Sequence, residues 1–254
     1  MPNIVKNTTF PTLLDLLAPH YCRGCGLIGK PICDRCKNYI LDSNRNLCPI
    51  CKHNNPTGIC SRCAKNQSAA LPPSNHSATT SYKESATPFP PTFIIGKRSD
   101  LLDVIIHDYK YHSVRALAAP LAEMLHRRLP EELPGKTVIV PLPTINRHIR
   151  TRGLDHTYLV AKKLAHYRPA YKVERLLLRN NNLVQVGASH QQRITQAASA
   201  YILNPKIKPQ KDVTYILLDD VWTTGASLRA ATKILQAAGI NKIILAILSL
   251  SILQ

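Results

Sequence analysis

The chain has 254 residues, of which 44% are hydrophobic, so it can bury one substantial core and a smaller second unit. Its 33 lysine and arginine residues outnumber its 15 aspartate and glutamate residues, which gives a formal net charge of +18. Basic residues occur in both halves of the chain, which excludes a single basic tail as the source of the charge. Such a surface attracts phosphates on nucleic acids, nucleotides or sugar phosphates, but charge alone does not distinguish this role from a solvated basic face.

Two apolar runs lie near the ends of the chain. The first, TLLDLLA at 12–18, follows Pro11 and is interrupted by Asp15, so it is shorter than the hydrophobic region of a signal peptide. The last, IILAILSLSIL at 243–253, is shorter than the roughly 20 apolar residues that a membrane helix needs. We therefore expect a cytoplasmic protein without a membrane span, in which the last run forms a buried strand.

All eight cysteines lie near the N-terminus, and each belongs to a Cys-x-x-Cys pair. Seven residues separate the first two pairs, and eight separate the last two. Four thiolates are what a structural tetrahedral zinc site requires, and they leave no position for a catalytic water. The spacing therefore predicts two structural Zn2+ sites, formed by Cys22, Cys25, Cys33, Cys36, Cys48, Cys51, Cys60 and Cys63.

Disulfide bonds and a different pairing of the cysteines are the alternatives. Zinc is favoured because a reducing cytoplasm does not preserve disulfides and because bridges between adjacent Cys-x-x-Cys pairs are strained. Sequential pairing is favoured because each intervening stretch has the length of a tight hairpin return, although an interleaved cross-brace also satisfies the spacing. His20 and His53 lie close enough to compete as ligands, but four cysteines per site make them bystanders.

Composition divides the chain into three regions. Residues 1–66 are expected to form an N-terminal helix and a double zinc ribbon, whose cysteine-rich part is too short to be stable without its metal. Residues 67–92 are rich in Ser, Thr, Pro and Ala, which predicts a flexible linker. Residues 93–254 are expected to form the larger domain.

Strands and helices alternate in this larger domain. Strands are predicted at 93–95, 137–143, 172–178, 213–220 and 242–250, and helices at 101–129, 154–167 and 226–239, the last of them ended by Gly239. This alternation predicts an α/β fold in which a parallel sheet has helices on both faces. Ligands of such folds bind at the carboxyl ends of the strands.

The stretch YILLDDVWTTGAS at 215–227 places chemistry at one of these strand ends. The helix that follows offers unpaired N–H groups and a positive dipole end to a phosphate, while Asp219 and Asp220 can accept hydrogen bonds from two adjacent hydroxyls, as on a ribose. Capping of the turn and the helix is the simpler explanation, but a single residue would suffice for it. The predicted phosphate cradle comprises Thr223, Thr224, Gly225, Ala226 and Ser227.

The order of four apolar residues, Asp-Asp, two further residues and Thr-Thr-Gly-Ala-Ser resembles the phosphoribosyl pyrophosphate signature of type I phosphoribosyltransferases. PLPTINRHIRTRGLDH at 141–156 and QVGASHQQR at 185–193 are similar to the corresponding loops of the ComF family, which has a double zinc ribbon upstream, as here. The resemblance covers most of the chain apart from the linker. It implies a type I phosphoribosyltransferase-like domain at 93–254.

The resemblance also implies roles for individual residues. Asp219 and Asp220 would hold the ribose hydroxyls, and residues 223–227 would hold the 5'-phosphate. Mg2+ would accompany the pyrophosphate. The segment similar to the pyrophosphate loop contains Arg147, Arg152 and Gly153, and the segment similar to the mobile hood contains Gln185 and Arg193. The chain departs from the family at two places, where it has Leu154-Asp155-His156 instead of Phe-Asn-Gln and Thr195-Gln196 instead of a common asparagine.

Two functions agree with the sequence. The first is a phosphoribosyltransferase, in which a nitrogen nucleophile displaces pyrophosphate from phosphoribosyl pyrophosphate. The second is a non-catalytic nucleotide sensor that uses its zinc module to contact single-stranded DNA or competence proteins, because the resemblance to ComF implies a link to DNA uptake in natural transformation. His107 and His112 are interpreted as surface or packing residues of a helix end, and Trp222 as a core residue.

Overall fold

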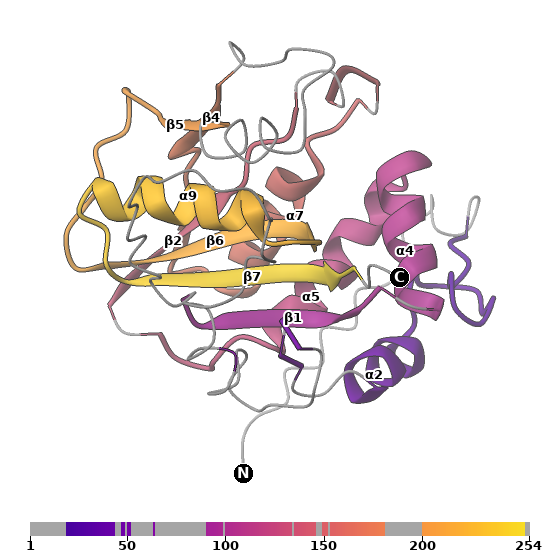
Figure 1. Ribbon diagram of the computed structural model, residues 1–254. Helices are drawn as coiled ribbons and strands as arrows, with labels where there is room; N and C mark the ends of the chain where they lie inside the picture. The colour runs from indigo at the N-terminus through magenta and orange to yellow at the C-terminus, as the bar shows by residue number, and fades with distance from the viewer. Residues whose placement is uncertain are drawn as a thin grey trace, which may run out of the picture.

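The computed structural model describes residues 19–43, 47–48, 50–51, 63, 90–98, 100–133, 135–145, 149–151, 153–180 and 200–251. The predicted N-terminal helix and most of the predicted linker lie outside these residues. None of the described helices is long and apolar enough to cross a membrane. The elements in Figure 1 are α2 (Asp34–Ser43), β1 (Thr92–Lys97), α4 (Asp100–Tyr111), η1 (Arg115–Leu117), α5 (Ala118–His126), β2 (Lys136–Pro141), α7 (His156–Tyr167), β3 (Tyr171–Val173), β4 (Leu177–Arg179), β5 (Tyr201–Leu203), β6 (Val213–Trp222), α9 (Ala226–Ala237) and β7 (Ile243–Leu250).

Five strands form one parallel sheet in the order β1-β7-β6-β2-β3. Alternate side chains of the central strand β6 enter two different cores, because successive residues of a strand point to opposite faces. Ile216 and Leu218 pack with residues of α4, α5 and α7, whereas Tyr215 and Leu217 pack with α9. Figure 1 shows α9 on one face of the sheet and α5 and α7 on the other. The predicted α/β fold with helices on both faces is confirmed.

The direction in which the chain crosses the sheet reverses between β2 and β6. From β2 the chain passes through α7 to β3 at one edge, and from β6 it passes through α9 to β7 in the opposite direction. The loops that leave β2 and β6 therefore lead to opposite faces, and ligands of such folds bind in a crevice at the carboxyl ends of two strands related in this way. Because β6 pairs with β2 only as far as Leu218 but with β7 as far as Trp222, the end of β6 extends beyond its pairing with β2.

Two predicted elements are divided in the structure. The predicted helix at 101–129 consists of α4, η1 and α5, because the backbone of Ser113 turns to a positive φ of 53° after α4. The predicted strand at 172–178 consists of β3, which joins the large sheet, and β4, which pairs antiparallel with β5 in a separate two-stranded sheet. The sequence analysis missed β5, since three residues are too few for a periodic pattern.

The described part of the cysteine region packs against the α/β sheet domain. Buried residues of its first part, among them Ile32 and Ile40, belong to the same hydrophobic core as α4 and α5. The buried ammonium of Lys37 on α2 binds the carboxylate of Glu123 on α5, and Arg128 donates a hydrogen bond of 2.6 Å to the carbonyl of Leu41. A paired buried charge and shared apolar contacts thus join α2 to the larger core.

Candidate functional site

Asp219 and Asp220 lie within β6, which ends at Trp222, two residues beyond the predicted end of the strand at residue 220. The strand continues because Val221 and Trp222 still pair with β7. Trp222 is buried in the core beneath α9, which confirms its interpretation as a core residue. Both aspartates lie beyond the last residue of β6 that pairs with β2, at the point where the strand order reverses and where ligands of such folds bind.

The two carboxyl groups are electrostatically coupled. The backbone N–H of Asp220 donates to Oδ1 of Asp219 at 2.8 Å, and the ammonium of Lys110 on α4 lies 2.7 Å from Oδ2 of Asp220. Burial and the charge of Asp220 raise the pKa of Asp219 to about 8, although the Asp220 N–H, Lys110 and Arg179 oppose this shift. Near neutral pH, a protonated Asp219 therefore offers a ligand both a donor and an acceptor.

The turn after β6 forms the N-terminus of α9. Gly225 is the N-cap residue and has a φ of 75°, a left-handed conformation that glycine adopts without strain. The hydroxyl of Thr224 accepts a 3.3 Å hydrogen bond from the N–H of Ala226, so this threonine has the capping role that was the simpler explanation. Thr223 and Ser227 are exposed beside it. The five predicted cradle residues thus surround an exposed helix N-terminus directly after the acid pair.

The small sheet of β4 and β5 brings a second cation toward the acid pair. Arg179 on β4 donates a 3.2 Å hydrogen bond to the hydroxyl of Tyr201 on β5 and lies 5.2 Å from the centre of its ring. Burial raises the pKa of Tyr201, an effect that Arg179 opposes and the charge of Asp219 increases. Arg179 and Lys110 were not among the predicted site residues. Only their tertiary position reveals them, because each lies far from residue 219 in the sequence.

The sequence analysis named three residues of the predicted pyrophosphate segment, and of these Gly153 lies within the described part of the chain. It adopts a φ of 65°, and its carbonyl accepts a 3.1 Å hydrogen bond from Nη2 of Arg115 on η1. The backbone of this segment is therefore attached to η1. The predicted ligands Arg147, Arg152 and Arg193, together with Gln185, lie outside the described residues.

Tyr109 connects the start of α7 with the acid pair. Its hydroxyl donates a 2.7 Å hydrogen bond to the carbonyl of His156, the first residue of α7. Burial, together with the negative charges of Asp155 and Asp220, raises the pKa of Tyr109. Because Tyr109 contacts His156 and the adjacent Lys110 contacts Asp220, the N-terminus of α7 and the acid pair of β6 meet the same turn of α4. The loop after β2 and the acid pair thus share the carboxyl edge of the sheet.

The cysteines form two clusters in the described residues. The four sulfur atoms of Cys22, Cys25, Cys33 and Cys36 lie within 4.8 Å of one another, as do the three of Cys48, Cys51 and Cys63. Zinc–sulfur bonds of about 2.3 Å in a tetrahedron place sulfur atoms about 3.8 Å apart, so both clusters could bind Zn2+. The pairing is the predicted sequential one for these seven residues, whereas Cys60 lies outside the described part of the chain.

The surroundings of the first cluster suit a structural metal site. The N–H of Cys33 donates to Sγ of Cys22 at 3.3 Å. Burial acts to raise the pKa of Cys22, but N–H groups of Cys33, Cys25 and Gly24 outweigh it and lower the value to about 6. A Cβ on Gly24 would lie 2.7 Å from Sγ of Cys36 and 2.9 Å from Cδ2 of Leu101, so a larger residue here would displace the Cys36 thiol or the Leu101 side chain of α4.

A third cluster of metal-ligating side chains lies at the end of α4. Ligand atoms of His107, Asp108 and His112 lie within 4.8 Å of one another. Nδ1 of His112 is 2.8 Å from one oxygen of Asp108, and Nε of Arg23 is 3.3 Å from the other. Asp108 is thus already engaged by two neighbours, and it holds the first cysteine loop against α4 through Arg23. This arrangement agrees with the interpretation of both histidines as surface residues.

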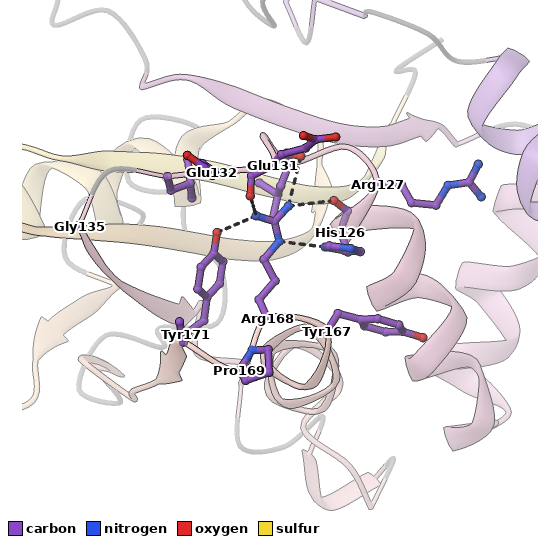
Figure 2. A pocket seen from close by; sticks show the side chains of 12 residues that line it. His126, Arg127, Glu131, Glu132, Gly135, Tyr167, Arg168, Pro169 and Tyr171 are labelled. Carbon is purple, nitrogen blue, oxygen red and sulfur yellow. Dashed lines mark hydrogen bonds between the residues drawn. The ribbon is translucent and has the colours of Figure 1, made fainter. Parts of the chain in front are cut away.

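A cavity of about 770 Å³ lies at the opposite edge of the sheet, beside the amino ends of β2 and β3 (Figure 2). Arg168 extends between its walls and uses all five of its N–H donors within the protein. Nε donates to Nδ1 of His126, Nη1 to the carbonyl of Glu131 and the hydroxyl of Tyr171, and Nη2 to the carbonyls of His126 and Leu129. No N–H of this guanidinium therefore remains for an anion.

No protein-family model matches this chain, and no curated protein is significantly similar to it. The functional assignment therefore depends on the residues and their geometry.

Proposed function

We propose that the protein binds phosphoribosyl pyrophosphate, a ribose with a phosphate on C5 and a pyrophosphate on C1, in the crevice between β2 and β6. One observation carries this proposal. The reversal of strand order brings the acid pair of β6, the N-terminus of α9 and the loop after β2 to the same edge of the sheet. The three parts of this ligand need acceptors for hydroxyls and two separate places for phosphates, which is why the meeting of these three segments supports the proposal.

The sugar and its 5'-phosphate would bind to consecutive parts of the chain. Asp219 and Asp220 would accept hydrogen bonds from the ribose 2'- and 3'-hydroxyls. The N–H groups around Gly225 and the exposed hydroxyls of Thr223 and Ser227 would bind the 5'-phosphate, with support from the positive end of the α9 dipole. The net charge of +18 would favour the approach of such an anion.

The pyrophosphate would bind on the β2 side of the crevice, in the segment that contains Arg147, Arg152 and Gly153. Arginine is suited to this role because its planar guanidinium can bind phosphate through two hydrogen bonds. The carboxylate oxygens of Asp220, and those of Asp219 once it has lost its proton, are of the kind that Mg2+ prefers, so they would also hold a Mg2+ that accompanies the ligand and offsets its negative charge.

The reaction class that fits this ligand is phosphoribosyl transfer. A nitrogen nucleophile would form a bond to C1 while the C1–O bond breaks, pyrophosphate would leave with the electron pair, and the nucleophile would then lose a proton. The residues proposed here would contribute position and charge stabilisation. The ComF family, which the sequence resembles, remains the proposed family for this combination of a cysteine-rich segment and a sugar phosphate site.

A second function is favoured by the surface of the cysteine region. Tyr21 and Tyr39 are 59% and 60% exposed, and Leu27 and Ile28 are 59% and 68% exposed. Exposed aromatic side chains on a basic protein are typical of surfaces on which single-stranded DNA bases stack. We therefore propose contact with single-stranded DNA, or with a protein of the competence machinery, as an activity of this region that is compatible with the sugar phosphate site.

Calorimetry with phosphoribosyl pyrophosphate and Mg2+ tests the main proposal. The zinc-loaded wild type is expected to bind, and an Asp219→Asn/Asp220→Asn variant is expected to lose most of its affinity. Asp212→Asn is a suitable control, because Asp212 pairs with Lys242 at 3.4 Å in the turn that precedes β6, away from the crevice. Absence of binding by the folded wild type would refute the site, and equal binding by all three proteins would refute the role of the carboxylates.

A further inference from the structure

Lys110 lies on α4, far in the sequence from Asp219 and Asp220, yet its side chain reaches the proposed ribose site. Its ammonium lies 2.7 Å from Oδ2 of Asp220, and the two side chains are only 12% and 22% exposed. In Figure 1, α4 lies at the end of the sheet toward which β1 and β7 point. A cation therefore lies against the carboxylate proposed to hold a ribose hydroxyl.

Several contacts fix the position of Lys110. The neighbouring Tyr109 is fully buried, donates to the carbonyl of His156 and packs edge-to-face on the His156 ring, with centroids 4.8 Å apart. Asp108, two residues before Lys110, binds Arg23 of the first cysteine loop. Lys110 thus projects from an anchored helical turn, which is the kind of support that a preorganised binding group requires.

The other described cations that act near the site have different partners. Arg115 donates to the carbonyl of Gly153, and Arg179 donates to the hydroxyl of Tyr201 and stacks on its ring. Lys110 binds one of the two acids directly. An ammonium has three N–H donors, so it can hold Asp220 and a ligand oxygen at the same time.

We propose that Lys110 binds the phosphate group attached to C1 of the sugar and makes the site selective for a ribose 5-phosphate that carries an anionic group on C1. This proposal rests on the proposed function. In this proposal Asp220 accepts the hydroxyl on C2, which is adjacent to C1, so the cation in contact with Asp220 lies next to any substituent on C1. The 5'-phosphate is at the far end of the sugar, where α9 would hold it. The preferred ligand class is thus a 1-pyrophosphorylated sugar phosphate, and sugar monophosphates and nucleoside monophosphates bind more weakly.

The test compares two ligands, phosphoribosyl pyrophosphate and ribose 5-phosphate, by calorimetry on the full zinc-loaded chain. Lys110→Met is expected to weaken the binding of phosphoribosyl pyrophosphate by about tenfold or more, as for loss of a charge-assisted hydrogen bond, and to change ribose 5-phosphate binding by less than about twofold. The readout is the ratio of the two affinities. A change in the protonation of Asp219 would affect both ligands alike, because both carry the hydroxyls that it binds, and so it would cancel in this ratio. Lys110→Arg, which keeps the charge, is expected to restore part of the ratio.

Lys242→Met is the matched control, since it removes a lysine that pairs with an aspartate at the opposite edge of the sheet. Circular dichroism and metal content verify that each variant is folded. Equal losses for both ligands in Lys110→Met would show that the lysine only supports Asp220, and unchanged or tighter phosphoribosyl pyrophosphate binding would show that it is a counterion that the ligand displaces. Either result overturns this proposal alone. A wild type that binds neither ligand overturns the proposed function and this proposal with it.

Discussion

Asp219 is the residue whose pKa the surrounding groups of the site shift in opposite directions. Burial and the adjacent Asp220 favour its protonated form, whereas Lys110 and Arg179 favour its ionised form. The first two effects are larger, and the pKa rises to about 8. Strongly perturbed carboxyl groups of this kind cluster at functional sites, which is why the acid pair is the starting point of the proposed function.

Asp219→Asn is expected to flatten the pH dependence of stability. Since the pKa of about 8 in the folded protein lies above the ordinary value of 3.8, the folded state holds this proton more tightly than the unfolded chain does. The resulting stabilisation is fully present below the ordinary pKa and is lost as the pH rises through about 8. The free energy of unfolding in urea should therefore fall more from about pH 5 to about pH 8 in the wild type than in the variant. Parallel pH curves for the two proteins would contradict this assignment.

Residues of the site were predictable where one short stretch of sequence contains them. Asp219, Asp220 and the cradle lie within nine residues, and the helix that follows them could be identified from its apolar spacing. Lys110 was not predictable, because its role depends on how α4 crosses the carboxyl edge of the sheet. The sequence placed it between two histidines of a surface helix end, and no local pattern distinguishes a lysine that meets solvent from one that meets a distant aspartate.

At the scale of elements, α9 offers a matched pair of glycines. Gly225 and Gly239 have φ values of 75° and 83° and lie at the N-terminal and C-terminal ends of the helix, and a Cβ on Gly239 would meet no atom within 4 Å. Alanine at either position is expected to cost about 1 kcal/mol of stability, because an L-residue is strained in this conformation. Only Gly225→Ala is expected to weaken phosphoribosyl pyrophosphate binding, by about tenfold or more, since it adds a side chain within the phosphate cradle.

Thermal melts measure the stability of both glycine variants, and calorimetry measures their affinity for phosphoribosyl pyrophosphate. Equal loss of affinity in Gly225→Ala and Gly239→Ala would show that binding responds to helix stability and not to the cradle.

The first cysteine cluster is expected to stabilise the larger core through its metal. Cys33→Ser should lose one zinc per chain and lower the melting temperature by several degrees, because Cys22 and Cys36 of the same cluster lie in the core shared with α4 and α5. Cys48→Ser is the control, since it should also lose one zinc, yet Cys48 belongs to neither of the two core clusters of the described residues. Metal analysis and thermal melts test this, and an unchanged zinc content in both variants would show that the thiols do not bind zinc.

Elements were predictable in proportion to their length and burial. The apolar runs of β6 and β7 identified buried strands because helices cover both faces of the sheet, which removes the polar alternation of an exposed strand. The boundary between α4 and η1 was not predictable, since Ser113 carries no signal for a positive φ. The cysteine spacing predicted the thiol clusters directly, because Cys-x-x-Cys fixes two ligands on one turn of the backbone.

At the scale of the whole molecule, the net charge of +18 and the topology of the sheet have separate consequences. The charge acts at long range and does not select a ligand, so it is expected to support binding to any polyanion. The reversal of strand order is a local feature, and it lies where the specific ligand is proposed to bind. The cavity beside Arg168 lies at the other edge of the sheet, away from this proposed site.

Binding to single-stranded DNA is therefore expected to depend strongly on salt. Each phosphate that a basic side chain neutralises releases counterions, with a slope of about −0.7 per contact in the logarithmic plot of affinity against salt concentration. Fluorescence anisotropy with a labelled oligonucleotide should give a slope of several units, and Tyr21→Ala/Tyr39→Ala should weaken binding without changing the slope, because stacking is insensitive to salt. A slope near zero would exclude phosphate contact as the basis of binding.

The most direct test of the central claim is a crystal structure of the zinc-loaded protein grown with phosphoribosyl pyrophosphate and Mg2+. The sugar is expected to lie between the carboxylates of Asp219 and Asp220, with its 5'-phosphate at the N-terminus of α9 and its pyrophosphate toward Lys110 and the loop after β2. Ligand density beside Arg168 at the amino edge of the sheet, or an empty crevice in crystals of a protein shown to bind the ligand in solution, would contradict the proposed site.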